Sequence, residues 1–458
     1  MNKKKGLAVL LMLLALVPMF AGEPVELTLD EAISSARSSN INLQQAQIQL
    51  NNAIRNQKAV MTTFMPTIAV GVEVDPTWNF ESDLSKLTYQ SSNGASGFDG
   101  SAFGYTLSAY ASASFTFNGS MITDSKTRSL SKESAAISYD QTYNTIEEAV
   151  VTAYWNIAAM DLSIESTRLS FEEAERQYNQ LQDMYASGLI DQLSLMQGKL
   201  AYNSAKLTLK AYEDSKDLLV SAFKNLTGVD YDFYVSEIPE MTFYALPEAE
   251  ELVALYGNRN LDVQSARNSL ESAKNGKTTT ELATYVPIVS VGLTYAYMGV
   301  DGYYASASST FDDYTHAANQ LSGSVSVTVP ISNMLPGSSY YHQIKDMDDS
   351  IKQAALNLQS VQDTLLEDVR EAKITIEQYQ DNLELLQDNL ETAELSYELS
   401  QQSYNSGLIT VDALSDSRDD YLSARMQLIQ TQVSHLLSVY DLAYELNIDI
   451  EELNQYTI

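Results

Sequence analysis

A seven-residue repeat runs through two long segments of the chain and constrains its fold more than any other feature. The positions of the second segment alternate in steps of four and three: Leu365, Val369, Ala372, Ile376, Tyr379, Leu383, Leu386, Leu390, Ala393, Tyr397, Ser400 and Tyr404. This mostly apolar spacing is typical of a helix packed along a narrow seam. No Gly or Pro lies between Gly337 and Gly407. We therefore expect one helix of roughly 100 Å, about three times the apolar thickness of a bilayer.

The first segment repeats this pattern 219 residues earlier, again with no Gly or Pro from Gly119 to Gly188. Its positions are Ile146, Val150, Ala153, Ile157, Met160, Ile164, Thr167, Phe171, Ala174, Tyr178, Leu181 and Tyr185. The match continues beyond the seams, because the turn sequence 185–190 aligns with 404–409. The sequence thus predicts an internal duplication with a first repeat at 22–246 and a second at 247–458.

Residues 1–21 are typical of a secretory signal peptide, with three lysines followed by a short apolar run. A retained membrane anchor is the alternative, although the run is too short to span a bilayer. Without this segment the chain has 24 basic and 60 acidic residues, so nucleic acid and anionic lipid surfaces are poor partners. The chain has no cysteine, which excludes disulfides, thiol catalysis and a lipid-modified cysteine.

In each repeat, a segment of helical composition also precedes a proline at which the residue pattern changes. Segment 29–64 begins with Thr28 and Glu31, a capping-box pair, and its counterpart begins near Glu248. The sequence 260–266 echoes 40–46, and the two helices end before Pro66 and Pro287.

Four segments then alternate with a period of two. One face carries Ile68, Val70, Val72 and Val74, then Tyr105, Leu107, Ala109, Ala111, Ala113, Phe115 and Phe117, and in the second repeat Val289, Val291, Leu293, Tyr295, Tyr297, Val325, Val327 and Val329. Small or polar residues occupy the other face. Strands of about ten residues with this pattern are typical of a transmembrane β-barrel. A soluble hairpin packed on the helices is the alternative.

The strands are connected in pairs by polar loops, predicted at 79–102 and 299–320. Four strands cannot close a barrel, and an open edge in lipid leaves backbone groups unpaired. Several copies would have to pool their strands. Two copies would give eight strands and three would give twelve, and the residues alone do not choose between them.

The remaining segments complete each repeat. Helices at 190–226 and 408–446 are predicted to return from the turns at Gly188 and Gly407, and 229–246 is a connector. We expect the tail 449–458 to be its counterpart in the second repeat and to be loosely held.

The sequence gives little support for an enzymatic function. His316, His342 and His435 are predicted in a loop, at the start of a long helix and on a returning helix, without the spacing of metal ligands. The sequence contains no phosphate-binding glycine loop and no hydrolase or zinc-protease motif. The sequence therefore predicts no enzyme, no cofactor and no metal site.

The order of elements resembles the TolC-like outer membrane efflux proteins. The chain begins with a leader and the sequence 27–32. These are followed by a helix ending at Pro66, two strands, a long helix and a Tyr-x-x-Gly turn, and the elements after the leader then repeat over the mature chain. The resemblance implies an α+β membrane protein in the outer membrane. Three chains would form a twelve-stranded barrel continuous with a periplasmic α-helical coiled-coil tunnel. Such a homotrimer is the exit duct of a tripartite efflux pump or type I secretion system, joined by a periplasmic adaptor to an inner-membrane transporter.

The resemblance also implies a gate at the periplasmic tip. The acidic positions of the family fall on Asp412 and Ser415, with Asp416 beside the latter. The basic residue that locks the gate would fall on Leu408 or Ile409, so the way in which the closed state is held is open. The turns that contact the adaptor would be Ser187, Gly188 and Leu189, and Ser406, Gly407 and Leu408. The glycines also fit simple helix C-caps.

The residues alone leave two other classes of function open. A secreted coiled-coil structural or adhesive protein would place the strands in a soluble cap. A stand-alone porin-like channel would need no adaptor. For a duct, we expect some carboxylates to line the lumen and favour cations, although an acidic outer surface explains each of them equally well.

Overall fold

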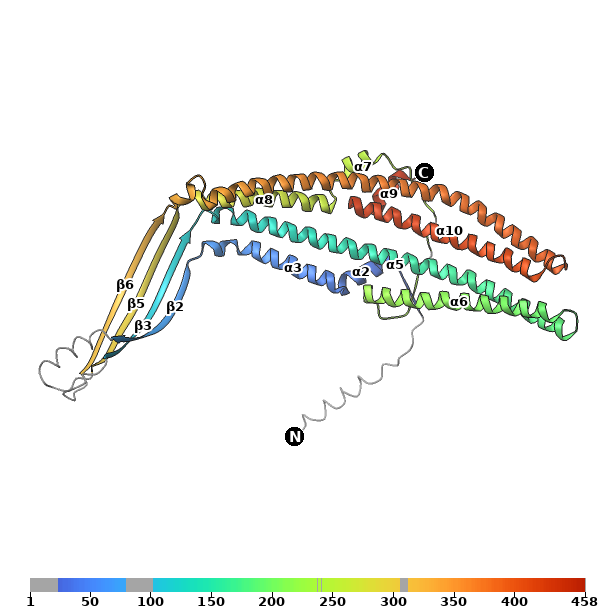
Figure 1. The fold of residues 1–458 in the computed structure, drawn as a ribbon, viewed down its shortest axis with the longest axis horizontal. Helices are drawn as coiled ribbons and strands as arrows, with labels where there is room; N and C mark the ends of the chain where they lie inside the picture. The colour runs from blue at the N-terminus through green and yellow to red at the C-terminus, as the bar shows by residue number, and fades with distance from the viewer. Residues whose placement is uncertain (1–23, 80–101, 237, 240, 305–311, 458) are drawn as a thin grey trace, which may run out of the picture. The chain divides into compact units, whose positions relative to one another are not determined.

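The computed structural model describes residues 24–79, 102–236, 238–239, 241–304 and 312–457 (Figure 1). The predicted signal peptide at 1–21 and nearly all of the loop at 79–102 lie outside these residues. The chain divides into two compact units. Unit 1 contains the residues up to Gln49 together with Ala136–Ser265 and Gln359–Ile458, and unit 2 contains Leu50–Ala135 and Ala266–Leu358.

The two predicted long helices are confirmed. Helix α5 spans Met121–Ala186 and helix α9 spans Ser339–Asn405, 66 and 67 residues without a break. The seam residues Val369, Ile376 and Leu383 of α9 have no exposed surface. Every seam position of α9 is buried or half-buried, and on α5 only Tyr185, next to the turn, is exposed. The seven-residue repeat therefore marks the buried side of both helices.

The returning helices form two hairpins with these rods in unit 1. Helix α6 spans Gln192–Thr227 and helix α10 spans Val411–Leu446. Tyr178 of α5 stacks on Tyr202 of α6 with ring centroids 5.4 Å apart. The equivalent Tyr397 and Tyr421 stack at 5.8 Å in the other hairpin. The duplication is thus preserved in side-chain packing as well as in sequence.

Each predicted helix before the strands is broken, so the expectation of single helices at 29–64 and from 248 to 285 was wrong. The first becomes α2 (Leu29–Ser39), α3 (Ile41–Lys58) and the 3-10 helix η1 (Ala59–Phe64). The second becomes α7 (Ala249–Tyr256) and α8 (Leu261–Tyr285). The capping box of Thr28 and Glu31 at the start of α2 is confirmed.

An asparagine side chain makes equivalent hydrogen bonds at the helix break in both repeats. Asn40 Oδ1 accepts the backbone N–H of Asn42 at 2.9 Å, and Asn260 Oδ1 accepts that of Val263 at 2.9 Å. Each amide group also donates to the last turn of the returning helix, Asn40 to the Leu226 carbonyl at 3.4 Å and Asn260 to the Glu445 carbonyl at 2.8 Å. The asparagine therefore caps a new helix and satisfies a carbonyl at the end of another.

A small sheet and the tail complete unit 1. Strand β1 (Val25–Leu27) pairs in parallel with β4 (Phe233–Val235). Tyr154 of α5 is fully buried, and its hydroxyl donates to the Leu27 carbonyl at 2.8 Å and accepts the Ser236 N–H at 2.9 Å. Through these two hydrogen bonds, the Tyr154 side chain joins both strands to the long helix.

The tail is not loosely held, contrary to expectation. It forms α11 (Ile450–Leu453) and η3 (Asn454–Tyr456), and Leu453 is fully buried. Thr457 forms a β-bridge with Tyr244 in the connector. Burial of one apolar side chain and this bridge explain why the charged tail is ordered.

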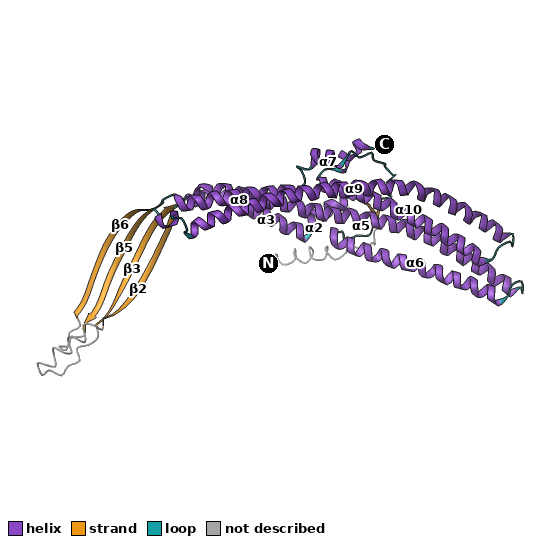
Figure 2. Ribbon diagram, turned by 45° about the horizontal axis from the view of Figure 1, so that its top comes forward, coloured by secondary structure: helices purple, strands orange, loops and turns teal. Residues whose placement is uncertain are grey.

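Unit 2 contains a four-stranded antiparallel sheet in the order β2-β3-β5-β6 (Figure 2). The strands are β2 (Thr67–Asn79), β3 (Ala102–Phe117), β5 (Ile288–Tyr304) and β6 (Asp312–Thr328). The predicted loop at 299–320 is therefore too long at both ends, and His316 lies in a strand rather than in a loop. Beyond β6 a 3-10 helix, η2 (Ile331–Met334), leads to α9.

The register gathers the apolar rows of all four strands on one face. Val70 pairs with Ala111, which pairs with Tyr295, which pairs with Leu321. Val70 is 82% exposed in the single chain, and Tyr295 and Leu321 are also exposed. A continuous exposed apolar face on a sheet is expected of a surface that meets lipid.

We expect Asn260→Ala to lower the free energy of unfolding by about 1–2 kcal/mol, because it removes a helix cap and leaves a carbonyl unpaired. The matched control is Asn42→Ala, at an exposed asparagine of the equivalent junction. Urea unfolding of both variants measures the difference. Equal stability of the two variants would contradict the role given to Asn260.

Candidate functional site

The two turns at the ends of the hairpins share one geometry. Gly188 and Gly407 both have a φ of +72°, a left-handed conformation that favours glycine. Leu189 N–H donates to the Met184 carbonyl at 2.8 Å, and Leu408 N–H donates to the Ser403 carbonyl at 2.9 Å. These six-to-one bonds are those of a Schellman motif, which satisfies the last carbonyls of α5 and α9.

The turns also present leucine to solvent. Leu189 is 71% exposed and Leu408 is 77% exposed, and Ser187 and Ser406 are exposed beside them. The next helices begin with side-chain caps, at Asp191 for α6 and Thr410 for α10. Since turn and cap fix the backbone on both sides, each leucine is displayed on a rigid support.

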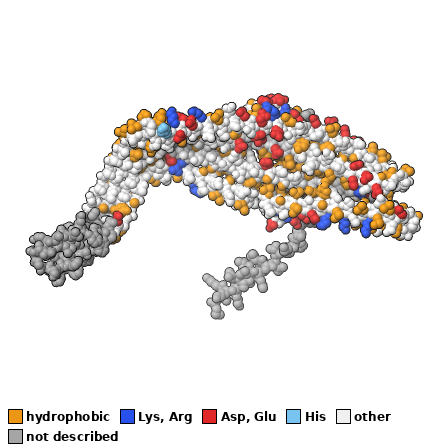
Figure 3. Space-filling model, in the orientation of Figure 1, with side chains coloured by type: hydrophobic (Ala, Val, Ile, Leu, Met, Phe, Trp, Pro, Cys, Tyr) orange, Lys and Arg blue, Asp and Glu red, His pale blue; other side chains and the backbone are white. Residues whose placement is uncertain are grey.

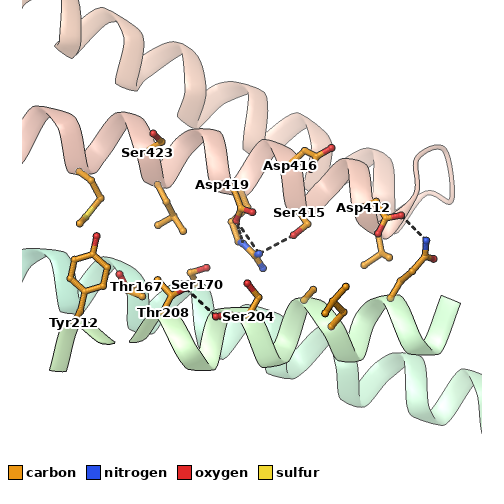
Figure 4. Close-up of a pocket in the computed structure, with 18 residues that line it drawn as sticks. Thr167, Ser170, Ser204, Thr208, Tyr212, Asp412, Ser415, Asp416, Asp419 and Ser423 are labelled. Atoms are coloured by element: carbon orange, nitrogen blue, oxygen red, sulfur yellow. Dashed lines mark hydrogen bonds and ion pairs between the residues drawn. The ribbon is translucent and has the colours of Figure 1, made fainter. Parts of the chain in front are cut away.

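The predicted gate residues lie at the start of α10. Asp412 accepts a hydrogen bond from Nε2 of Gln197 at 2.8 Å, which joins α10 to α6. Asp416 is exposed and lines the same space, and Ser415 is half-buried. The structure therefore brings Asp412, Ser415 and Asp416 to one wall between the two hairpins (Figure 4).

Sequence reasoning missed Arg418, the most buried charge of this region. Arg418 is only 5% exposed and donates to Ser415 Oγ at 2.9 Å and to Asp419 Oδ1 at 3.1 Å. A signal was present, because Arg418 is the one basic residue between Lys373 and Arg425. Leu408 and Ile409 supply no cation, but this arginine supplies one about ten residues further along.

Arg418 lines a pocket of about 620 Å³ between α6 and α10, with part of α5 behind. Small side chains of the first hairpin face it, including Ser170, Ala201, Ser204 and Ala205. The pocket lies at the junction of the two hairpins and combines acidic, basic and small polar side chains. Gln197 and Asp412 line this pocket, and their hydrogen bond is a polar contact between the two hairpins.

Carboxylates gather at the other end of α10. Burial, followed by the charges of Asp368, Asp262 and Glu148, raises the pKa of Glu445, and a hydrogen bond from Asn260 opposes this. Figure 3 shows the excess of acidic over basic side chains on the displayed face of the helices. His435 on the same helix is 4% exposed, and burial lowers its pKa.

Within the described ranges, no three His, Cys, Asp or Glu side chains form a group that could hold a metal ion. Over the same part of the chain, no helix is both long and apolar enough to cross a membrane.

A family model for outer membrane efflux proteins matches residues 32–229 and 254–444. The chain belongs to this family. Members are outer membrane efflux channels without enzymatic activity, with the helical part in the periplasm. No functionally curated protein matches the chain.

Solved structures of outer membrane proteins share the fold of this family member. The Campylobacter jejuni CmeC outer membrane channel is 14% identical, with a TM-score of 0.70, over 93% of this chain and 88% of CmeC. VceC from Vibrio cholerae is 17% identical, with a TM-score of 0.66, over 92% and 96%. The open state of the Neisseria gonorrhoeae MtrE outer membrane channel is 16% identical, with a TM-score of 0.68, over 92% and 89%. The fold therefore matches that of these outer membrane proteins over 88–96% of their chains.

We expect Glu445→Gln to stabilise this efflux protein at about pH 7 and to have no effect near pH 4. The pKa of Glu445 is raised in the folded state, so the folded state binds more protons than the unfolded state between the two pKa values. Stability contributed by this site therefore falls as pH rises through that window, and glutamine removes the penalty.

Urea unfolding at several pH values measures this effect, with the exposed Glu451→Gln as control. A Glu445→Gln variant that is less stable than the parent at pH 7 would contradict the assignment.

Proposed function

We propose that this channel is the outer membrane exit duct of a tripartite efflux pump or type I secretion system, and that it acts as a homotrimer. The observation that carries the proposal is the four-stranded sheet of unit 2, which has an exposed apolar face and in which β2 and β6 each have one neighbour among the described residues. Backbone groups at an edge cannot stay unpaired in lipid. Three copies would place twelve strands in one closed barrel.

The turns of unit 1 support a protein partner at the periplasmic end. Two exposed leucines on rigid turns, Leu189 and Leu408, offer apolar contacts to the helical hairpin of a periplasmic adaptor. The sequence contains no phosphate-binding glycine loop, so the energy for transport comes from an inner-membrane transporter that the adaptor connects to this duct.

The hydrogen bond between the hairpins supports a gate at this position, and the buried Arg418 beside it is assigned to the same gate. The Gln197–Asp412 hydrogen bond and the buried Arg418 both lie between α6 and α10. Moving the second hairpin away from the first would break the Gln197–Asp412 hydrogen bond and expose Arg418 to water. The adaptor opens the duct by stabilising the separated hairpins, and Arg418 takes the place of a basic residue at 408 or 409.

We expect Arg418→Met combined with Gln197→Ala to increase the conductance of the resting channel in planar bilayers, because Gln197→Ala removes a hydrogen bond between the hairpins and Arg418→Met removes the buried charge at their junction. Arg425→Met, seven residues further along α10, is the matched control. An unchanged resting conductance, with trimer formation intact, would exclude these residues from the gate.

Purified protein in planar bilayers tests the duct itself. The excess of carboxylates predicts cation preference, measured as the sign of the reversal potential in a salt gradient. A preference for anions would contradict carboxylates in the lumen. Release of the protein from membranes by carbonate would instead favour an adhesive coiled coil, and a large leak without any adaptor would favour a porin-like channel.

A further inference from the structure

Basic side chains are concentrated in the part of unit 2 where the helices join the sheet. The segments that flank the four strands, here called the sheet-end segments, are 50–66, 118–135, 266–287 and 330–358. Together they contain ten basic and seven acidic residues, whereas the rest of the chain after residue 21 contains 14 basic and 53 acidic residues. The charge thus changes sign next to the sheet. The net charge of the whole chain, which makes anionic lipid a poor partner, does not describe this region.

Ion pairs within unit 2 already occupy most carboxylates of the sheet-end segments. The paired carboxylates are Asp124, Glu271, Glu281, Asp348 and Asp349. Among the described residues, Arg55, Lys58 and Lys132 form no ion pair, and segment 50–66 contains no acidic residue at all. Arg55 and Lys58 are also exposed. Positive charge is therefore left without a partner beside the sheet.

Large apolar side chains are exposed at the joints between these segments and the strands. Those within seven residues of a strand end, with 47–67% of their surface exposed, include Phe64, Met65, Tyr285, Ile331 and Leu335. Aromatic and apolar side chains at the end of a lipid-facing band lie at the boundary between membrane and water. The helical part of this family is periplasmic. The sheet-end segments therefore begin at the headgroups of the periplasmic leaflet.

Lysines lie close enough to the joints to reach these headgroups. Lys126 is five residues into α5, Lys345 is six residues into α9, and Lys58 directly precedes the six residues of η1. Each is within roughly 12 Å of the sheet-side end of its helix, and lysine side chains extend further. The pairs of Lys126 with Glu271 at 3.5 Å and of Lys345 with Asp348 at 3.9 Å are long and partly exposed. Such pairs are weak and leave the amines available.

A second copy of the chain does not neutralise this charge, because it brings the same sheet-end segments with the same excess. The partner must be anionic and must lie at the depth where the apolar joints end. Figure 3 shows basic side chains together with apolar ones at the end of the helices next to the sheet, on the displayed face. A phospholipid with an anionic headgroup matches both, since its phosphate meets lysine and its acyl chains meet the apolar face of the sheet.

We propose that the sheet-end segments bind anionic phospholipid headgroups of the periplasmic leaflet, with Lys58, Lys126 and Lys345 contacting the phosphates. The contact fixes the depth at which the sheet lies in the bilayer. It rests on the membrane location of the sheet in the proposed function, and it requires neither an adaptor nor a transporter.

Native mass spectrometry of the full-length protein tests the contact. The protein in neutral detergent is mixed with equal amounts of phosphatidylglycerol and phosphatidylcholine that carry the same acyl chains. The parent should retain phosphatidylglycerol in excess. Lys58→Gln combined with Lys126→Gln and Lys345→Gln should lower the ratio of the two retained lipids by about fivefold or more, because each basic residue beside an anionic surface contributes a factor of about five.

Two further variants show whether charge at these positions is responsible. Arginine at the same three positions should keep the preference, because it keeps the charge. The matched control is Lys199→Gln combined with Lys206→Gln and Lys210→Gln, at three exposed lysines of α6 in unit 1, and it should leave the ratio unchanged. Raising the salt concentration should weaken the preference of the parent, a measurement that needs no variant to fold.

Equal retention of both lipids by a parent that forms conducting trimers would overturn the lipid contact and leave the duct intact. An equal loss of preference in the α6 control would overturn it too, because total charge would then explain the preference. So would displacement of phosphatidylglycerol by an equal concentration of glycerophosphate, or binding to purified cell wall in its place. A parent that neither forms trimers nor conducts would reject the proposed function itself.

Discussion

The unpaired backbone groups along β2 and β6 are the constraint on which the rest of the architecture depends. A sheet whose apolar face meets lipid cannot leave these groups without partners. Within the described residues of one chain, each of the two strands has one neighbour in the sheet. In the proposed homotrimer, copies of the chain complete the sheet for one another, and the helices have to allow several copies to stand side by side around a space.

The helical part repeats the same few side-chain and turn interactions in both halves of the chain. Stacked tyrosines hold each hairpin, a Schellman turn closes it, and an asparagine at the helix break bonds to the end of the returning helix of the same repeat. Each device involves only a few side chains within one repeat, so a duplicated sequence can preserve it without preserving the residues on the solvent faces. The two halves do differ in charge, since α6 has five basic and three acidic residues whereas its counterpart α10 has two basic and six acidic residues.

Sequence periodicity predicted the long helices and the strands because burial on one side imposes a period of seven or of two. It did not predict the breaks at Asn40 and Asn260, because an asparagine within a helical stretch becomes a cap only when another helix ends against it. Arg418 was missed for a related reason, since its burial comes from small residues 213–248 positions earlier in the chain. The ordered tail depends on the burial of Leu453 and on a β-bridge from Thr457 to Tyr244. Long-range contacts of this kind leave no periodic trace.

Very short joints connect the strands to the helices within unit 2. Two residues separate η1 from β2, three separate β3 from α5, and two separate α8 from β5. Proline occupies two of these joints, at Pro66 and Pro287, and fixes its own backbone angle. Such stiff couplings would pass torque directly from helix to strand.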